Sequence, residues 1–98
     1  MISSVNIVVD DTQAHALNGG DTNQQGPAAG NSVLIKNYGP SDVYIGGSDV
    51  TADGASSTGG YILAANEVIA IAAMAGEIAY AICATGEGVV LSVLRQGY

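Results

Sequence analysis

The chain has few of the side chains that perform chemistry or grip charged ligands. Its 98 residues include two Lys+Arg, one His and one Cys, and neither Trp nor Phe occurs. A disulfide within one chain is excluded because Cys83 stands alone, and its apolar neighbours indicate a buried structural thiol. The shortage of basic residues argues against nucleic acid and membrane surfaces as partners, because both require clustered Lys or Arg.

The titratable residues do not form a recognised site. His15 has neither a cysteine nor a second histidine with which to build a zinc set, and Ser48 lies outside any nucleophile-elbow motif. Asp42, Asp49 and Asp53 lie in segments rich in Gly and Ser, where aspartate typically caps turns. We therefore expect no catalytic, cofactor-binding or metal-binding residues, and we expect that the protein is not an enzyme.

Apolar residues are abundant instead. Hydrophobic residues make up 48% of the chain, although its net charge is −7. A domain this small buries only about 60–65% of the surface of its unfolded chain, so oligomerisation or docking on a larger body would add stability. No basic segment precedes an apolar core near the N-terminus, and Glu67 and Glu77 divide the apolar stretch 61–84 into runs too short to span a membrane. These features predict a soluble protein with a partner surface.

Residues 1–31 are predicted to form an N-terminal strand followed by an arm or loop. Residues 4–10 alternate between apolar and polar side chains, and a second short strand is predicted at 13–17. Residues 18–31 are rich in Gly, Asn and Gln and cannot bury enough apolar area to fold by themselves. A loop this long indicates a function or a partner contact. The apolar face of the first strand consists of Val5, Ile7 and Val9.

Residues 32–98 are predicted to form the core of a single all-β domain, a β-sandwich or small barrel. A β-hairpin is predicted from strands at 32–38 and 42–46, because Gly39 and Pro40 form a turn signal between them. Short strands with glycine-containing turns at regular spacing are typical of such folds. The remaining strands are predicted at 49–51, 60–63, 67–73, 77–84 and 89–96.

The alanine-rich segment 67–84 allows two interpretations. Alanine is the best helix former, which favours a helix. Gly76 interrupts the segment, however, and the bulky residues Ile78, Tyr80 and Ile82 alternate with small ones. A period of two favours strands. A sheet with two apolar faces needs a cover on both, and another subunit can supply the second cover.

A spaced pattern from Val33 to the C-terminus consists of the segments 35–39 (IKNYG), 42–47 (DVYIGG), 50–51 (VT), Gly60 before 62–63 (IL), 67–68 (EV), 78–82 (IAYAI) and 93–97 (VLRQG). This pattern resembles small β-structured virion proteins of tailed bacteriophages. Such sequences are similar to head-decoration (cement) and head-fibre proteins, and similar modules occur in tail and baseplate proteins. The resemblance implies a jelly-roll-like sandwich, often trimeric, that binds the outside of an assembled capsid.

Two functions are expected on these grounds. The first is a capsid decoration protein that is made in the host cytoplasm, forms a homo-trimer and binds the major capsid protein on the virion surface, stabilising the head. The alternative is a tail, baseplate or adhesin module that contacts host glycans through tyrosines, Asn37 and Asp42. Tyrosine is favoured at interfaces because it combines apolar area with a polar tip. The residues expected at the partner or oligomer interface are Val5, Ile7, Val9, Tyr38, Tyr44, Ile69, Ile71, Tyr80 and Tyr98.

Overall fold

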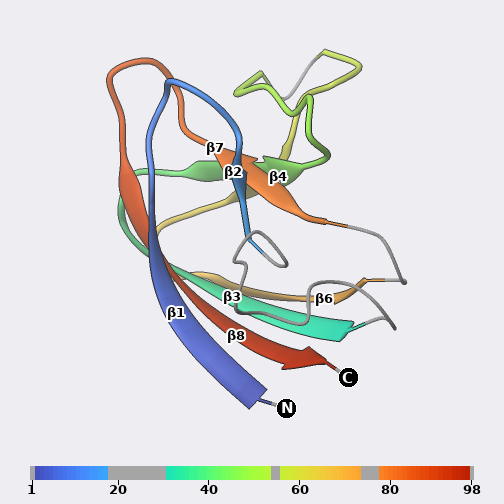
Figure 1. The fold of residues 1–98 in the computed structure, drawn as a ribbon. Helices are drawn as coiled ribbons and strands as arrows, with labels where there is room; N and C mark the ends of the chain where they lie inside the picture. Colours follow the sequence, from blue (N-terminus) through green and yellow to red (C-terminus); the bar gives the residue numbers. More distant parts are fainter. Residues whose placement is uncertain (1, 18–30, 54–55, 74–77, 98) are drawn as a thin grey trace.

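A computed structural model gives the fold of the chain and describes residues 2–17, 31–53, 56–73 and 78–97. These residues form strands and turns, with no helix among them. The strands build two four-stranded antiparallel sheets packed face to face, as Figure 1 shows. The strands are β1 (Ile2–Val9), β2 (His15–Ala16), β3 (Asn31–Pro40), β4 (Val43–Gly46), β5 (Tyr61–Leu63), β6 (Val68–Ala73), β7 (Tyr80–Ile82) and β8 (Val89–Gly97).

The strands are nested in the order of a jelly roll. The first sheet has the order β1-β8-β3-β6, and the second sheet has the order β2-β7-β4-β5. The first strand of the chain pairs with the last, and the two middle strands pair with each other. The predicted all-β, jelly-roll-like sandwich is therefore confirmed. The predicted N-terminal segment supplies β1 and β2 to the two sheets, whereas residues 18–30 of the predicted arm lie outside the described residues.

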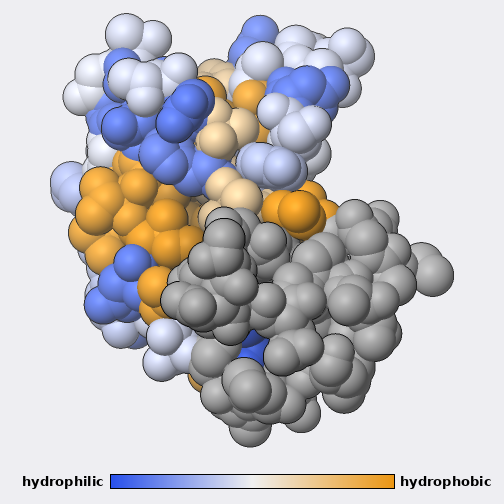
Figure 2. All heavy atoms as spheres, in the orientation of Figure 1, coloured by the Kyte–Doolittle hydropathy of each residue, from blue (hydrophilic) through white to orange (hydrophobic). Residues whose placement is uncertain are grey.

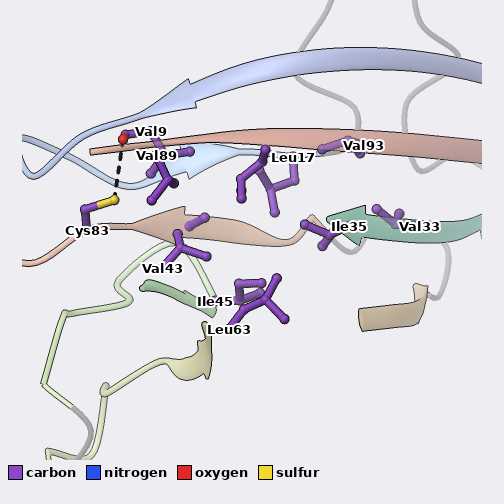
Figure 3. Close-up of a cluster of buried hydrophobic side chains, with 12 residues drawn as sticks. Val9, Leu17, Val33, Ile35, Val43, Ile45, Leu63, Cys83, Val89 and Val93 are labelled. Atoms are coloured by element: carbon purple, nitrogen blue, oxygen red, sulfur yellow. Dashed lines mark hydrogen bonds between the residues drawn. The ribbon is translucent and has the colours of Figure 1, made fainter. Parts of the chain in front are cut away.

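The core lies between the sheets and consists of the inward side chains of alternating strand positions. Val33 and Ile35 of β3 are buried, while Leu34 between them is exposed. This period of two is what a strand with one face in a core requires. Figure 3 shows the cluster, to which both sheets contribute. Its buried members are Val9, Leu17, Val33, Ile35, Val43, Ile45, Leu63, Ala81, Cys83, Val89, Leu91 and Val93.

The described part of the alanine-rich segment is extended, so the strand interpretation is confirmed. Its small side chains Ala81 and Cys83 face the core and let the sheets approach closely. The Cys83 Sγ donates a hydrogen bond to the Val9 carbonyl oxygen of the opposite sheet at 3.4 Å (Figure 3).

The predicted hairpin between β3 and β4 is wrong, because the two strands belong to different sheets. β3 is already flanked by β6 and β8, so the chain crosses to the second sheet at this corner. The fully buried Asn37 side chain holds the corner. Its Oδ1 accepts a hydrogen bond from the Gly39 N–H at 2.7 Å, and its Nδ2 donates to the carbonyls of Ser41 and Leu63, both at 2.9 Å. Gly39 has φ +83°, a conformation that favours glycine.

The predicted strand at 49–51 is replaced by a turn and a single bridge. The Val50 N–H donates to the Gly47 carbonyl at 3.0 Å, and Thr51 forms an isolated parallel bridge with Gly59. The reason is local, because a chain that turns at 47–50 cannot extend a strand through the same residues.

Gly60 lets the β4–β5 connection lie against the second sheet. A Cβ added at Gly60 would lie 2.7 Å from the Tyr44 Cβ and 2.7 Å from a methyl group of Val50, so no larger residue fits without displacement. Val50 is buried there. The connection therefore covers part of the outer face of the second sheet.

Candidate interaction surface

The outer face of the first sheet carries large apolar side chains that no described residue covers. Val8 on the edge strand β1 is 68% exposed, and Val68 on the opposite edge strand β6 is 53% exposed. Several large exposed apolar residues gathered on one face are unusual for a surface without a partner. We call this face the outer patch; it consists of Val8, Leu34, Tyr38, Val68, Ala70, Val90 and Leu94.

The strand register places the members of the outer patch side by side. Leu34 lies opposite Leu94 of β8 and opposite Ala70 of β6, and Val8 lies opposite Val90. Directly opposed side chains have Cβ atoms about 4.5–5.5 Å apart, so each of these apolar rows is continuous across its strands. The polar side chains of Asn6, Ser92 and Lys36 form the row between them. Figure 2 shows hydrophobic side chains gathered at the left of the molecule, where β1 and β8 lie in Figure 1.

A depression of about 220 Å³ lies within the outer patch. It is lined by Ser32, Val33, Leu34, Ala70 and Leu94, and it forms where the small Ala70 stands beside larger neighbours. Pockets for drug-sized ligands measure about 300–1,000 Å³. The depression suits an apolar side chain of a partner better than a free small molecule.

Charge is nearly absent from the outer patch and concentrated elsewhere. Lys36 is the one charged side chain on this face within the described residues, and its Nζ lies 4.9 Å from the centre of the Tyr38 ring. Acidic residues occupy the connections β1–β2, β3–β4, β5–β6 and β7–β8, which meet at one end of the sandwich. We call this end the acidic end; its residues are Asp10, Asp11, Asp42, Glu67 and Glu87.

Carboxylates at the acidic end hold turns. Asp10 Oδ1 accepts hydrogen bonds from the Thr12 N–H at 3.1 Å and the Thr12 hydroxyl at 2.7 Å, and it lies 3.0 Å from His15 Nε2. The contact with His15, followed by those with Thr12, lowers the pKa of Asp10 to about 2. Asp11 accepts a hydrogen bond from the Gly86 N–H at 2.8 Å, which ties the β1–β2 connection to the β7–β8 connection. Within the described ranges, no group of three or more His, Cys, Asp or Glu side chains could hold a metal ion.

Cys83 is not placed as a nucleophile. Burial raises the pKa of its thiol to about 11, and the negative charges of Glu87, Asp10 and Asp11 act in the same direction. The thiol therefore stays protonated at neutral pH. It is unreactive in this form, because only the thiolate reacts readily.

The apolar residues predicted at the interface lie on the inner face of the first sheet. Val9 is fully buried, and Ile7, Ile69 and Ile71 pack against the core, so these side chains serve the chain's own interior. Val5 also points inward but is 37% exposed, because it lies on the edge strand. The alternation located the strands, but it did not reveal which face points outward.

The predicted tyrosines are dispersed. Tyr38 belongs to the outer patch and is 55% exposed. Tyr44 and Tyr80 are half-buried on the outer face of the second sheet, and Tyr98 lies outside the described residues. The sequence prediction did not include Val8, Leu34, Val68, Val90 or Leu94. Each of them is adjacent in sequence to a residue that the alternation places in the core, so each points to the opposite, exposed face.

Comparison of the sequence with protein-family models and with curated proteins finds no match. Helices long and apolar enough to cross a membrane do not occur in the described part of the chain. Function must therefore be inferred from the fold and from the outer patch.

Proposed function

We propose that the chain is a capsid decoration protein of a tailed bacteriophage. It associates with itself and docks on the outer surface of the assembled head, where it contacts the major capsid protein. The observation that carries the proposal is the outer patch, because a nearly uncharged apolar sheet face binds protein surfaces. The fold is compatible with this role, since jelly rolls occur in viral capsid proteins and in lectins.

The physical effect of such a protein follows from mass action. A ligand that binds the assembled shell but not its separated subunits stabilises the shell by about 2.7 kcal/mol per site when its free concentration is 100 times its Kd. A subunit that touches neighbouring capsid proteins acts in this way without any chemical step. A subunit that extends far enough to touch neighbouring capsid proteins, and that has enough apolar contact area to bind them, is sufficient for the function.

The charge distribution supports docking through the outer patch rather than through the acidic end. With a net charge of −7, the chain repels other acidic surfaces at long range. Among the described residues, the face that carries the outer patch has one charged side chain, the cation Lys36. A neutral or mildly acidic apolar surface can therefore approach this face without direct repulsion.

The tail or adhesin alternative has weaker support from the side chains. Of its candidate glycan contacts, Asn37 is fully buried and its amide is bonded within the chain. Exposed tyrosines remain, including Tyr38 and Tyr61, and they lie on different sheets. The head position is therefore the preferred proposal.

The test uses particles of the phage whose genome encodes this chain. Quantitative mass spectrometry should find the chain in fixed proportion to the major capsid protein, and labelled antibody should mark the heads. Heads stripped of the chain should lose heat resistance and regain it when the purified chain is added. Heads without any copies would overturn the proposal, and copies found on tails would establish the alternative.

A matched pair of variants connects the binding to the outer patch. Leu94→Gln changes a residue that is 42% exposed on the outer patch, and Ile62→Gln changes a residue that is 46% exposed on the other sheet. The first variant should fail to restore heat resistance, whereas the second should restore it. Equal behaviour of the two variants would show that docking does not use the outer patch.

A further inference from the structure

The outer edge of β1 is an open strand edge without the usual protection. β1 pairs with β8 through all eight of its residues, from Ile2 opposite Gln96 to Val9 opposite Val89, without a bulge. Its other side has no strand partner among the described residues. The strand contains no charged residue and no proline. Proteins normally protect such edges with charges, prolines, bulges or very short strands.

The edges of the second sheet are protected by their length. β2 has two residues and β5 has three, so neither offers a long row of backbone groups. β6, the other edge of the first sheet, is six residues long, and its inward isoleucines pack against the core. β1 has exposed large apolar side chains on both faces, because Val5 is 37% exposed on the inner face and Val8 is 68% exposed on the outer one. β5 also exposes Tyr61 and Ile62, but it is only three residues long. Adding a strand beside β1 would cover both residues.

We propose that two copies of the chain pair along β1, antiparallel and about a two-fold axis, so that the two first sheets become one sheet of eight strands. The proposal rests on the self-association in the proposed function and names the edge that carries it, with a dimer in place of the homo-trimer that the resemblance implies. A two-fold axis perpendicular to the sheet keeps inward residues opposite inward residues. Centring the pair on Asn6 places Val5 opposite Ile7 of the second copy and pairs seven residues of each strand.

The distribution of charge favours this arrangement over a parallel one. Asp10 and Asp11 follow β1 directly. In the antiparallel pair the two Asp10 residues lie eight positions apart, which is about 27 Å at 3.4 Å per residue. That separation exceeds the Debye length of about 8 Å at physiological ionic strength, so repulsion between the acidic ends is screened. The rotation also leaves both outer patches facing the same direction, available to one large partner surface.

Charge variants at the centre of the proposed pair provide the test. Asn6→Lys and Asn6→Asp each place like charges opposite one another across the two-fold axis, which should weaken the dimer about tenfold or more. Mixing the two variants should restore it, because the charges are then opposite. Ser48→Lys adds the same charge at an exposed position in the β4–β5 connection of the second sheet and should leave association unchanged. Light scattering measures the mass, with 9.7 kDa for the monomer and twice that value for the pair.

The outcomes separate this inference from the proposed function. If both Asn6 variants associate like the unmodified chain, if mixing fails to restore association, or if the unmodified chain is a trimer, pairing along β1 is wrong. Failure of an intact dimer to bind heads would instead overturn the decoration role. If the charged variants do not fold, an Asn6→Cys variant decides, since opposed residues with Cα atoms about 4.5–5.5 Å apart form disulfides. It should cross-link between copies under oxidising conditions, and a Ser48→Cys variant should not.

Discussion

Replacing Asn37 with alanine should destabilise the protein more than any other single removal of a polar side chain in the described core. Asn37 is the buried polar residue among the described side chains, and it connects three backbone groups of two corners. The substitution leaves the buried Gly39 N–H and Leu63 carbonyl without these partners. An unsatisfied buried group costs about 1–3 kcal/mol, so we expect a loss of about 4 kcal/mol in the free energy of unfolding.

The loss is large against the stability of a domain of this size, which is about 5–15 kcal/mol. A change of 1 kcal/mol shifts the Tm of a 60–100-residue domain by about 4–8 °C, so the variant should melt about 15–30 °C lower. Urea unfolding followed by circular dichroism measures the free energy directly. Gln13→Ala is the control, because it removes an exposed side-chain amide in the β1–β2 connection and should change stability by less than about 0.5 kcal/mol. A loss below about 1 kcal/mol for Asn37→Ala would refute the role of this side chain as the corner's support.

Three further outcomes are expected. The folded-state pKa of Asp10 lies near 2, below its ordinary value of 3.8, so its contact with His15 stabilises the fold above pH 4 and is lost as the pH falls toward 2. The urea midpoints at pH 5 and pH 2.5 should therefore differ more for the unmodified chain than for Asp10→Asn. Equal differences would count against the contact. Cys83 should react with a thiol reagent much more slowly in the folded protein than in urea, and rapid native labelling would contradict its burial. Gly60→Ala should lower the free energy of unfolding by about 1–3 kcal/mol through overpacking. Gly47→Ala should change it little, because a Cβ added at Gly47 has no contact closer than 3.5 Å. Thermal unfolding measures both variants.

Most strands could be predicted from the sequence because each shows an alternation that depends on its own residues. The partner of a strand depends on residues far along the chain, and local turn signals do not contain that information. The Gly39-Pro40 signal correctly located a change of direction, but it could not show that both sides of β3 were already occupied. Asn37 gave a usable signal, since an asparagine two residues before a glycine is typical of a side chain that closes a turn on its own backbone.

The interaction surface was harder to predict, since both faces of the first sheet are apolar. In β1, the alternation separates Val5, Ile7 and Val9 from Val8, and the sequence predicts the larger apolar set at a partner interface. In the fold, that set completes the core, and Val8 on the other face is exposed. The exposed side chains of the outer patch account for part of the abundance of apolar residues, but the choice of face required the pairing of β1 with β8.

Sedimentation equilibrium of the unmodified full chain, from low micromolar to millimolar concentration, tests most directly whether copies of the chain cover its open sheet. We expect the average mass to rise with concentration from 9.7 kDa toward twice that value. A single species of 9.7 kDa over the whole range would contradict self-association, and with it the pairing along β1.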